Sequence, residues 1–402
     1  MSAGRRVVLG LVALLLLGLT ACVQEGEDRR TGSPTELLSP PVPPEVEASR
    51  LTRVKAPKPA PLRAGEERMT VTMDEPYTPS APTGEGTDDY RCFLLDPHLA
   101  KDSWLTGTNV LPGNPAVVHH VILFRVAPDQ VREAERLDAE TPDPGWTCFG
   151  GSGLSGEFTN VDDASWLGAW APGGRESLTR DGYGVRLEAG SRIVMQVHYN
   201  LLQGASPDLS STQLRWMPGD RGLTPVHTYL LPAPVEMPCR PDHDDGPLCD
   251  RDAAMADVME RFGTAGNTNS LLHLLCGTDV EPSSTTSCTR TMGRPVTILG
   301  VAGHMHLLGR EISIVTNAGT DREQTVLDIP IWDFDDQGVK PVDPVDLEPF
   351  DTVSVRCRHV QWLRDVLPAF ETQRDDRYVV WAEGSTDEMC LGILQVAYRE
   401  NS

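Results

Sequence analysis

The sequence predicts an all-β protein. Its 402 residues include 33 prolines and 36 glycines, and few stretches have the apolar period of a long helix. Short runs rich in Val, Ile and Leu, bounded by turn residues, are typical of strands in sandwiches. The roughly 335 residues after the N-terminal region are more than a single hydrophobic core usually includes. We therefore expect two domains, over residues 67–208 and 209–402.

Residues 1–22 have the features of a lipoprotein signal peptide. Arg5-Arg6 precede an apolar run from Val7 to Leu19 that is too short to span a bilayer comfortably. The segment ends as the lipobox Leu19-Thr20-Ala21-Cys22, so we expect Cys22 to carry the lipid. A plain cleaved signal with a chance cysteine is the alternative, and in both cases the chain is exported. No aspartate follows Cys22, which favours the outer over the inner membrane.

Composition indicates the character of the N-terminal linker and excludes one class of partner. Residues 23–66 are proline-rich at 40–44 and 55–61 and poor in aromatic residues, which predicts a disordered tether. The net charge of -23 argues against nucleic acid as a partner, because few basic groups would neutralise phosphates. We expect a monomer that meets the membrane only through its lipid anchor.

The predicted elements follow in chain order. A helix is expected at 129–139, and Pro142 and Pro144 prevent it from continuing. A first unit is expected to close near residue 205. Strands are expected at residues 69–78, 88–95, 117–124, 164–174, 185–187, 193–200, 228–231, 295–302, 352–357 and 393–398.

Cysteines indicate disulfides. Nine cysteines less the lipidated one leave eight, an even number in an exported chain. None forms a Cys-x-x-Cys pair, which makes a zinc ribbon improbable. Residues 238–292 hold four of them with one amphipathic helix at 253–262, and we interpret this segment as an insertion. Sequential pairing is our guess for its four cysteines, which are Cys239, Cys249, Cys276 and Cys288.

Histidines gather in three apolar, strand-like stretches. Side chains at i and i+2 of a strand share a face, so His304 and His306 can present two imidazoles to one metal ion. His119-His120 and His198 lie in two further stretches of this kind. A histidine there would be destabilising unless its nitrogens had partners, and these patterns together predict metal binding.

The adjacent pair raises a geometric problem. His119 and His120 should point to opposite faces of a regular strand. Both reach one metal only if the strand twists or bulges, or if the two rings bind through different nitrogens. A third possibility is that one histidine is a ligand and the other is structural.

Four motifs follow one another along the chain: His119-His120, Gln196-Val197-His198-Tyr199, His304-Met305-His306-Leu307-Leu308-Gly309 and Thr386-Asp387-Glu388-Met389-Cys390. In this order they resemble the copper type II, ascorbate-dependent monooxygenases, the family of peptidylglycine α-hydroxylating monooxygenase and dopamine β-monooxygenase. The resemblance covers roughly residues 68–400, and the stretch 169–171 is similar as well.

The resemblance implies two tandem antiparallel jelly-roll β-sandwich domains with a cleft between them and two copper ions per chain. His119, His120 and His198 would bind the electron-transfer copper in the first domain. The set His304, His306 and Met389 would bind the O2-activating copper in the second and form the catalytic site. A thioether ligand favours Cu(I), the form that meets oxygen. The implied reaction hydroxylates a C–H bond of a small molecule, with O2 and electrons from ascorbate or a similar reductant.

The resemblance also has consequences for cysteines and substrate. It implies the pairs Cys92–Cys148 and Cys357–Cys390, whereas the family's further cysteine after the paired histidines is missing at residues 124–126. Where the peptide-amidating enzyme has an arginine, an asparagine and a tyrosine, this chain has Ala302, Leu391 and Ile393. A peptide carboxylate would lose its bidentate partner, which makes peptidylglycine an unexpected substrate and suggests a more apolar pocket, for an aromatic or lipid-like molecule.

Two other functions compete with this one. A non-catalytic copper-binding or copper-delivery lipoprotein could use the same ligands without a substrate site. A zinc hydrolase would need a three-ligand site with water and a general base, and Met389 as a ligand argues against it. The histidines His98, His227, His243, His273 and His359 have no motif context and are expected to be structural or exposed.

Overall fold

The protein is described as a computed structural model over residues 58–81, 88–155, 162, 164–172, 174–202 and 204–400. This part of the chain is mostly β, which confirms the predicted class. The signal peptide, Cys22 and the first part of the expected tether lie outside the described residues. Within the described ranges, the helices fall short of the length and apolarity that a membrane span needs.

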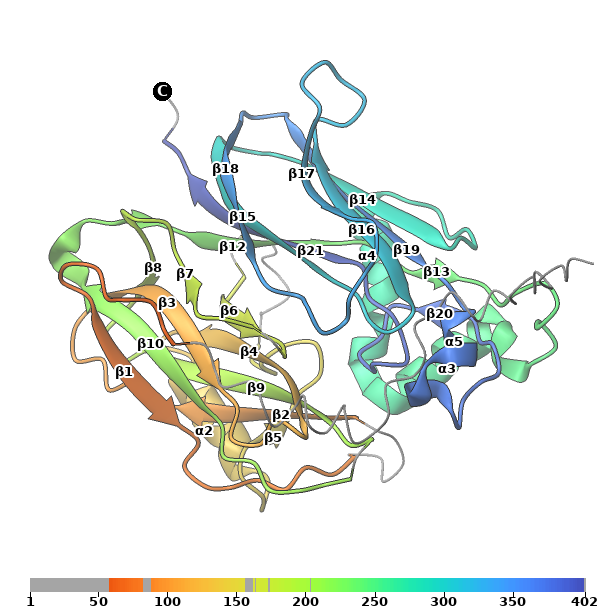
Figure 1. The fold of residues 1–402 in the computed structure, drawn as a ribbon, viewed down its shortest axis with the longest axis horizontal. Helices are drawn as coiled ribbons and strands as arrows, with labels where there is room; N and C mark the ends of the chain where they lie inside the picture. The colour runs from red at the N-terminus through yellow and green to blue at the C-terminus, as the bar shows by residue number, and fades with distance from the viewer. Residues whose placement is uncertain are drawn as a thin grey trace, which may run out of the picture. The chain divides into compact units, whose positions relative to one another are not determined.

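Two sheets form from the strands up to residue 225 (Figure 1). The first has the order β1-β10-β3-β8-β11, with β7 paired to β3, and the second has the order β5-β2-β9-β4-β6. The first sheet consists of β1 (Glu67–Thr72), β3 (Ser103–Leu111), β7 (Ser177–Leu178), β8 (Tyr183–Leu187), β10 (Ser211–Pro218) and β11 (Thr224–Pro225). The second consists of β2 (Asp88–Leu95), β4 (Val118–Val126), β5 (Trp146–Thr147), β6 (Trp166–Trp170) and β9 (Arg192–Asn200).

These two sheets share one core. Leu105 and Leu214 of the first sheet pack in the same buried cluster as Val121 and Met195 of the second. The opposite face of the second sheet is covered by α2 (Val131–Ala139), whose apolar side joins a second cluster. Strand β4 is therefore buried on both faces, which explains why its sequence is a continuous apolar run rather than an alternating one.

Two further four-stranded sheets form from the later residues. Their orders are β12-β21-β15-β18 and β14-β19-β16-β17. The third sheet consists of β12 (His227–Pro232), β15 (Val296–His304), β18 (Lys340–Leu347) and β21 (Leu391–Tyr398). The fourth consists of β14 (Thr285–Thr291), β16 (Gly309–Thr316), β17 (Gln324–Ile329) and β19 (Thr352–His359).

A second large core lies between these sheets, because residues of both, such as Ile298 and Ile314, belong to one buried cluster. The pair β13 (Glu236–Met237) and β20 (Val379–Val380) lies beside the helices of this part (Figure 1). Those α-helices are α3 (Arg251–Phe262), α4 (Thr268–Cys276) and α5 (Leu363–Val366). The short 3₁₀ helices are η4 (Gly219–Arg221), η5 (Pro247–Cys249), η6 (Gly263–Asn267) and η7 (Pro368–Phe370).

Two boundaries lie at other residues than the sequence indicated. Strand β10 pairs with β1 and β3, so the first pair of sheets continues past residue 208 and the pairing changes near residue 226. Strand β14 pairs with β19 along its whole length, so it belongs to a sheet and the expected insertion ends before residue 285 rather than at 292. Strands were expected to resume from Thr212, which agrees with β10, whereas β14 was missed because its sequence is mostly polar.

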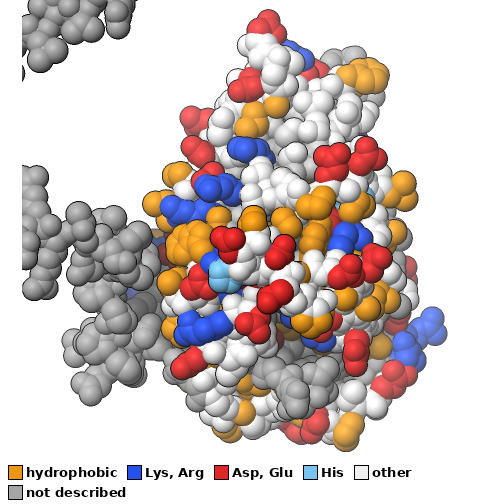
Figure 2. Space-filling model, turned by 90° about the vertical axis from the view of Figure 1, so that its right-hand side faces the viewer, with side chains coloured by type: hydrophobic (Ala, Val, Ile, Leu, Met, Phe, Trp, Pro, Cys, Tyr) orange, Lys and Arg blue, Asp and Glu red, His pale blue; other side chains and the backbone are white. Residues whose placement is uncertain are grey.

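All four disulfides agree with the predicted pairs. Cys92–Cys148 joins β2 to the segment after β5, and Cys357–Cys390 joins β19 to the residue just before β21. The sequential pairs Cys239–Cys249 and Cys276–Cys288 are also present. Acidic side chains are spread among basic and hydrophobic ones on the face shown in Figure 2 rather than gathered in one patch.

The end of the expected tether is ordered. Glu66 is 7% exposed and forms an ion pair with Arg215, which is 1% exposed. Arg215 also donates a hydrogen bond to the backbone oxygen of Pro61 over 2.6 Å. Burial would raise the pKa of Glu66, but hydrogen bonds from the Arg63 backbone, Thr106 and Arg215 lower it. The predicted disorder is therefore wrong for residues 58–66.

We expect Glu66→Ala to destabilise the protein by about 3 kcal/mol, because it leaves a buried guanidinium without its main partner. The adjacent Glu67→Ala is the control, since Glu67 is exposed and its loss should change stability by less than about 0.5 kcal/mol. Denaturant unfolding of both variants measures the difference. Equal stability of the two variants would show that the buried ion pair of Glu66 with Arg215 does not stabilise the protein.

Candidate metal site

Three histidines meet on the second sheet. The ligand atoms of His119, His120 and His198 all lie within 4.8 Å of one another, and all three side chains are buried. The Nδ1 atom of His120 lies 3.3 Å from Nδ1 of His119 and 3.2 Å from Nδ1 of His198. The three Nδ1 atoms therefore converge on one point.

A bulge explains how adjacent histidines share a face. The register between β4 and β9 shifts between Val118 and His120, which leaves His119 as the extra residue. An extra residue turns the next side chain toward the same side. Of the alternatives left open by the sequence, the bulge is the one observed, and both rings turn the same nitrogen inward.

Asp88 fixes the third ring. Its Oδ1 lies 2.7 Å from His198 Nε2, so His198 donates from Nε2 and leaves Nδ1 free for a metal. Ser385 donates to the same carboxylate over 2.6 Å, and Tyr90 stacks on the His198 ring at 4.1 Å. Burial would raise the pKa of Asp88, but the hydrogen bonds from His198 and Ser385 and the nearby imidazoles lower it to about 2.

The histidines are suited to bind a cation. Burial, together with the neighbouring imidazoles, lowers the pKa of His120 well below its usual value, and burial also lowers that of His198. Neutral imidazoles are the form that binds metals. The Nδ1 atom of His306 is buried without a hydrogen-bond partner among the described residues, whereas His119 Nε2 lies 3.7 Å from the Asp335 carboxylate. Such an unpaired nitrogen is destabilising unless something binds in the cluster.

His304 and His306 lie beside this triad. Their ring centroids are 5.1 Å apart, and that of His304 is 5.9 Å from that of His120. His304 Nδ1 is hydrogen-bonded to Gln337 Oε1, and Phe334 of the same loop stacks on His119 at 4.3 Å. Burial lowers the pKa of His304 to about 4. The five histidines thus form one cluster rather than two widely separated groups.

Glycines flank the His-x-His stretch because its backbone is tightly packed. A Cβ on Gly303 would meet Ile312 at 2.9 Å, and one on Gly309 would meet Met305 and Trp332 at 2.9 Å. Both glycines are required by close approach rather than by a left-handed backbone.

Glu388 positions the segment of Met389 against the His306 loop. Its buried carboxylate accepts backbone N–H groups of His306 at 3.0 Å, Leu308 at 2.5 Å and Met389 at 3.2 Å. His359 lies 3.3 Å from this carboxylate and donates to the Met389 carbonyl over 3.1 Å. The Met389 side chain is 7% exposed and packs in the large core cluster.

The neighbouring residues add further restraints. Arg261 of α3 binds the buried Asp387 through two hydrogen bonds of 2.6 and 2.8 Å. On the other side, Cys390 is tied to Cys357. Asp387 and Glu388 were expected only as motif context, and His359 is a buried structural histidine, one of the two roles expected for it. The sequence did not indicate the roles of Asp88 and the Phe334 loop. An acidic residue at the start of β2 was the only available signal for Asp88.

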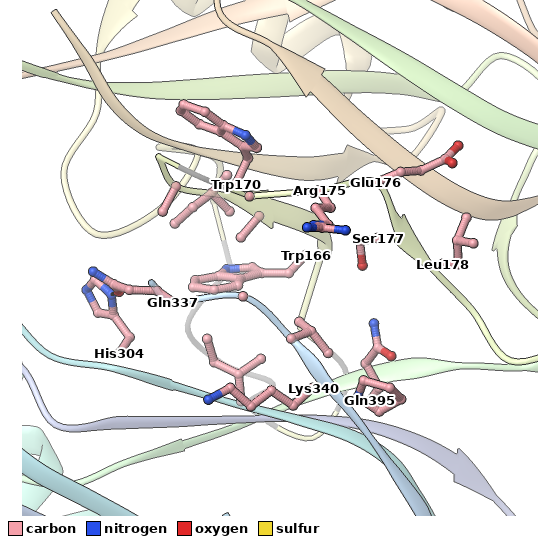
Figure 3. A pocket seen from close by; sticks show the side chains of 18 of the residues that line it. Trp166, Trp170, Arg175, Glu176, Ser177, Leu178, His304, Gln337, Lys340 and Gln395 are labelled. Carbon is pink, nitrogen blue, oxygen red and sulfur yellow. Dashed lines mark hydrogen bonds between the residues drawn. The ribbon is translucent and has the colours of Figure 1, made fainter. Parts of the chain in front are cut away.

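A cavity of about 600 Å³ opens onto both groups of histidines, through His120 and His304. Trp166 and Trp170 of β6 line one side, and Gln395 of β21 lines the other (Figure 3). Ala169 of β6 and Ile393 of β21 also line the cavity. Ile393, one of the three positions that depart from the peptide-amidating pattern, lines this cavity. Ala302 and Leu391 are instead buried, at 2% and 5% exposed.

Glu383, in the segment between β20 and β21, contacts Tyr90 of β2. Its backbone carbonyl accepts the Tyr90 hydroxyl over 2.6 Å. Burial, reinforced by the charge of Asp387, raises the pKa of Glu383 to about 8. A carboxyl with a raised folded-state pKa contributes stability that is complete below its unfolded pKa and is lost as the pH rises through the folded value.

We therefore expect Glu383→Gln to change the pH dependence of stability. Relative to Glu383→Gln, the wild-type protein should lose on the order of 4 kcal/mol of unfolding free energy between about pH 4.5 and pH 8. Denaturant unfolding of both metal-free proteins at pH 5, 6.5 and 8 measures this difference. Because the buried histidines titrate in both proteins, they cancel in the comparison. A constant difference across this range would contradict a raised pKa.

Comparison with protein families and with curated proteins finds no match. Among solved structures, the chain is similar to the major capsid protein P2 of bacteriophage PM2, with 7% identity over 84% of this chain and 99% of that chain and a TM-score of 0.28. It is also similar to allantoicase, with 10% identity over 84% and 90% and a TM-score of 0.18. Procruciferin, an 11S globulin from Brassica napus, follows with 10% identity over 85% and 83% and a TM-score of 0.16. Such low TM-scores carry no argument about function.

Proposed function

We propose that the protein is a copper-dependent monooxygenase that hydroxylates a C–H bond of a small molecule other than peptidylglycine. The observation that carries the proposal is the convergence of three buried Nδ1 atoms beside a second histidine pair, with one cavity opening onto both. Two tandem jelly-roll domains with the site in a cleft between them would suit this function.

The residues present fit copper. Three neutral imidazoles suit both oxidation states, and a thioether with two imidazoles favours Cu(I). His119, His120 and His198 would hold one ion, and His304, His306 and Met389 the other. Bound copper would supply one-electron chemistry with O2, using electrons from ascorbate or a similar reductant. Asp88 and Gln337 orient His198 and His304 through the ring nitrogens that do not bind metal.

The cavity favours an enzyme over a copper carrier. A carrier needs only ligands, whereas this chain places a cavity of about 600 Å³, the size of a small-molecule site, against both groups of histidines. The alternative of a copper-delivery lipoprotein remains the second candidate because the same ligands serve it. The proposal includes export of the protein and its anchoring to the outer membrane through a lipid on Cys22. The four disulfides suit such an oxidising compartment.

Copper content and O2 uptake of the full chain test the proposal. The protein is loaded with copper, and ascorbate-dependent O2 uptake is measured with a panel of substrates. Two ions per chain with substrate-stimulated uptake, abolished in His119→Ala and Met389→Ala, is the expected result. Two bound ions without stimulated uptake would favour the carrier, and no bound copper would overturn both functions.

A further inference from the structure

We propose that the cavity beside His120 and His304 binds a flat, apolar ring compound that carries a carboxylate. The inference rests on the proposed function, since it names the substrate class of that same site. It depends on two features of the cavity lining: a flat apolar wall and unpaired positive charge.

The apolar wall comes from the face of the second sheet that carries His120. Ala169 pairs with Ile122 and Trp166 pairs with Phe124, so these side chains share one face of neighbouring strands. Trp166 is held edge-to-face by Phe124, with centroids 5.8 Å apart and planes at 85°. The small, exposed Ala169 leaves room beside the indole. Leu299 and Ile393 line the same cavity from the third sheet. A ring stacked on Trp166 would therefore contact apolar groups on both sides.

The cavity also has an excess of positive charge, in a chain whose net charge is -23. Arg175, Arg180 and Lys340 line it, and within the described ranges none of the three has a carboxylate partner. Of the two acidic residues in the lining, Glu176 is bound by Arg68 at 2.7 Å, which leaves only Asp336 to offset the three cations.

The charges are placed to orient a ligand. Figure 3 shows His304 at one end of the cavity, Arg175 projecting between Trp166 and Ser177, and Lys340 on the opposite wall. A carboxylate held by Arg175 would direct the remainder of a ring lying on Trp166 toward His120 and His304. Arginine suits this contact because its planar guanidinium can bind a carboxylate with two hydrogen bonds.

Equilibrium binding to the copper-free full chain tests the inference. The probes are naphthalene-2-carboxylate, its neutral carboxamide and the cationic 2-naphthylmethylamine, followed by tryptophan fluorescence. We expect the carboxylate to bind about 5-fold more tightly than the carboxamide, the upper range for a pair with an exposed side chain such as Arg175. Arg175→Gln should remove this preference and leave carboxamide binding unchanged. Trp166→Leu should weaken both probes alike.

Arg132→Gln is the matched control, because it removes one exposed positive charge on α2, outside the cavity lining. It should leave the preference for the carboxylate intact, which separates a local contact from a change in net charge. Equal affinities for the carboxylate and the carboxamide, or tightest binding of the amine through Asp336, would overturn the inference. Binding is measured without copper, so a failure of the O2 uptake test leaves this result interpretable. If only uncharged substrates stimulated O2 uptake, the proposed substrate class would be overturned, and the proposed monooxygenase function would stand.

Discussion

His120→Ala is expected to lower ascorbate-dependent O2 uptake by more than about 100-fold and to remove one copper ion per chain. His120 is the central ring of the cluster, with its Nδ1 3.2 to 3.3 Å from both partner nitrogens and its ring next to His304. Changing residues that only support a ligand already reduces metal affinity about 10–100-fold, so loss of the ligand itself should have a larger effect.

Metal analysis and O2 uptake of the same sample check this expectation. His243→Ala is the matched control, because His243 is an exposed histidine far from the cluster in sequence and outside the cavity lining. The control should retain both ions and full uptake. Two bound ions in His120→Ala would show that the triad is not a metal site.

Glu388→Ala is expected to destabilise the protein by about 4 kcal/mol and to disturb copper binding at His304, His306 and Met389. The substitution leaves three buried backbone N–H groups without their acceptor. Each unsatisfied buried donor costs about 1–3 kcal/mol.

The destabilisation is measured by denaturant unfolding of the metal-free protein, and the second effect by the copper-dependent spectra of the loaded protein. Glu281→Ala is the control, because Glu281 is exposed. A change of less than about 1 kcal/mol in Glu388→Ala, with normal copper content, would show that Cys357–Cys390 and Arg261 hold the Met389 segment without Glu388.

Local features of the sequence were enough to predict about half of the described strands, whereas two disulfide pairs were implied by the family resemblance and two were a guess of sequential pairing. Strand β2 lies at the expected residues 88–95, and α2 lies within the expected 129–139. Prediction succeeded there because an apolar run bounded by turn residues has few alternatives to a strand. It failed for β3, since buried polar residues such as Thr106, Thr108 and Asn109 make its sequence look like a loop.

For the candidate site, the sequence by itself determined which residues have metal-binding chemistry, because imidazole and thioether groups are recognisable wherever they lie. Only the tertiary structure decided how they meet. The bulge at His119 depends on the pairing of β4 with β9, and Asp88, Glu388 and the Phe334 loop reach the histidines across long sequence separations. The cavity charges likewise come from segments on different sheets. Such contacts leave no local pattern in the sequence, because packing between distant segments creates them.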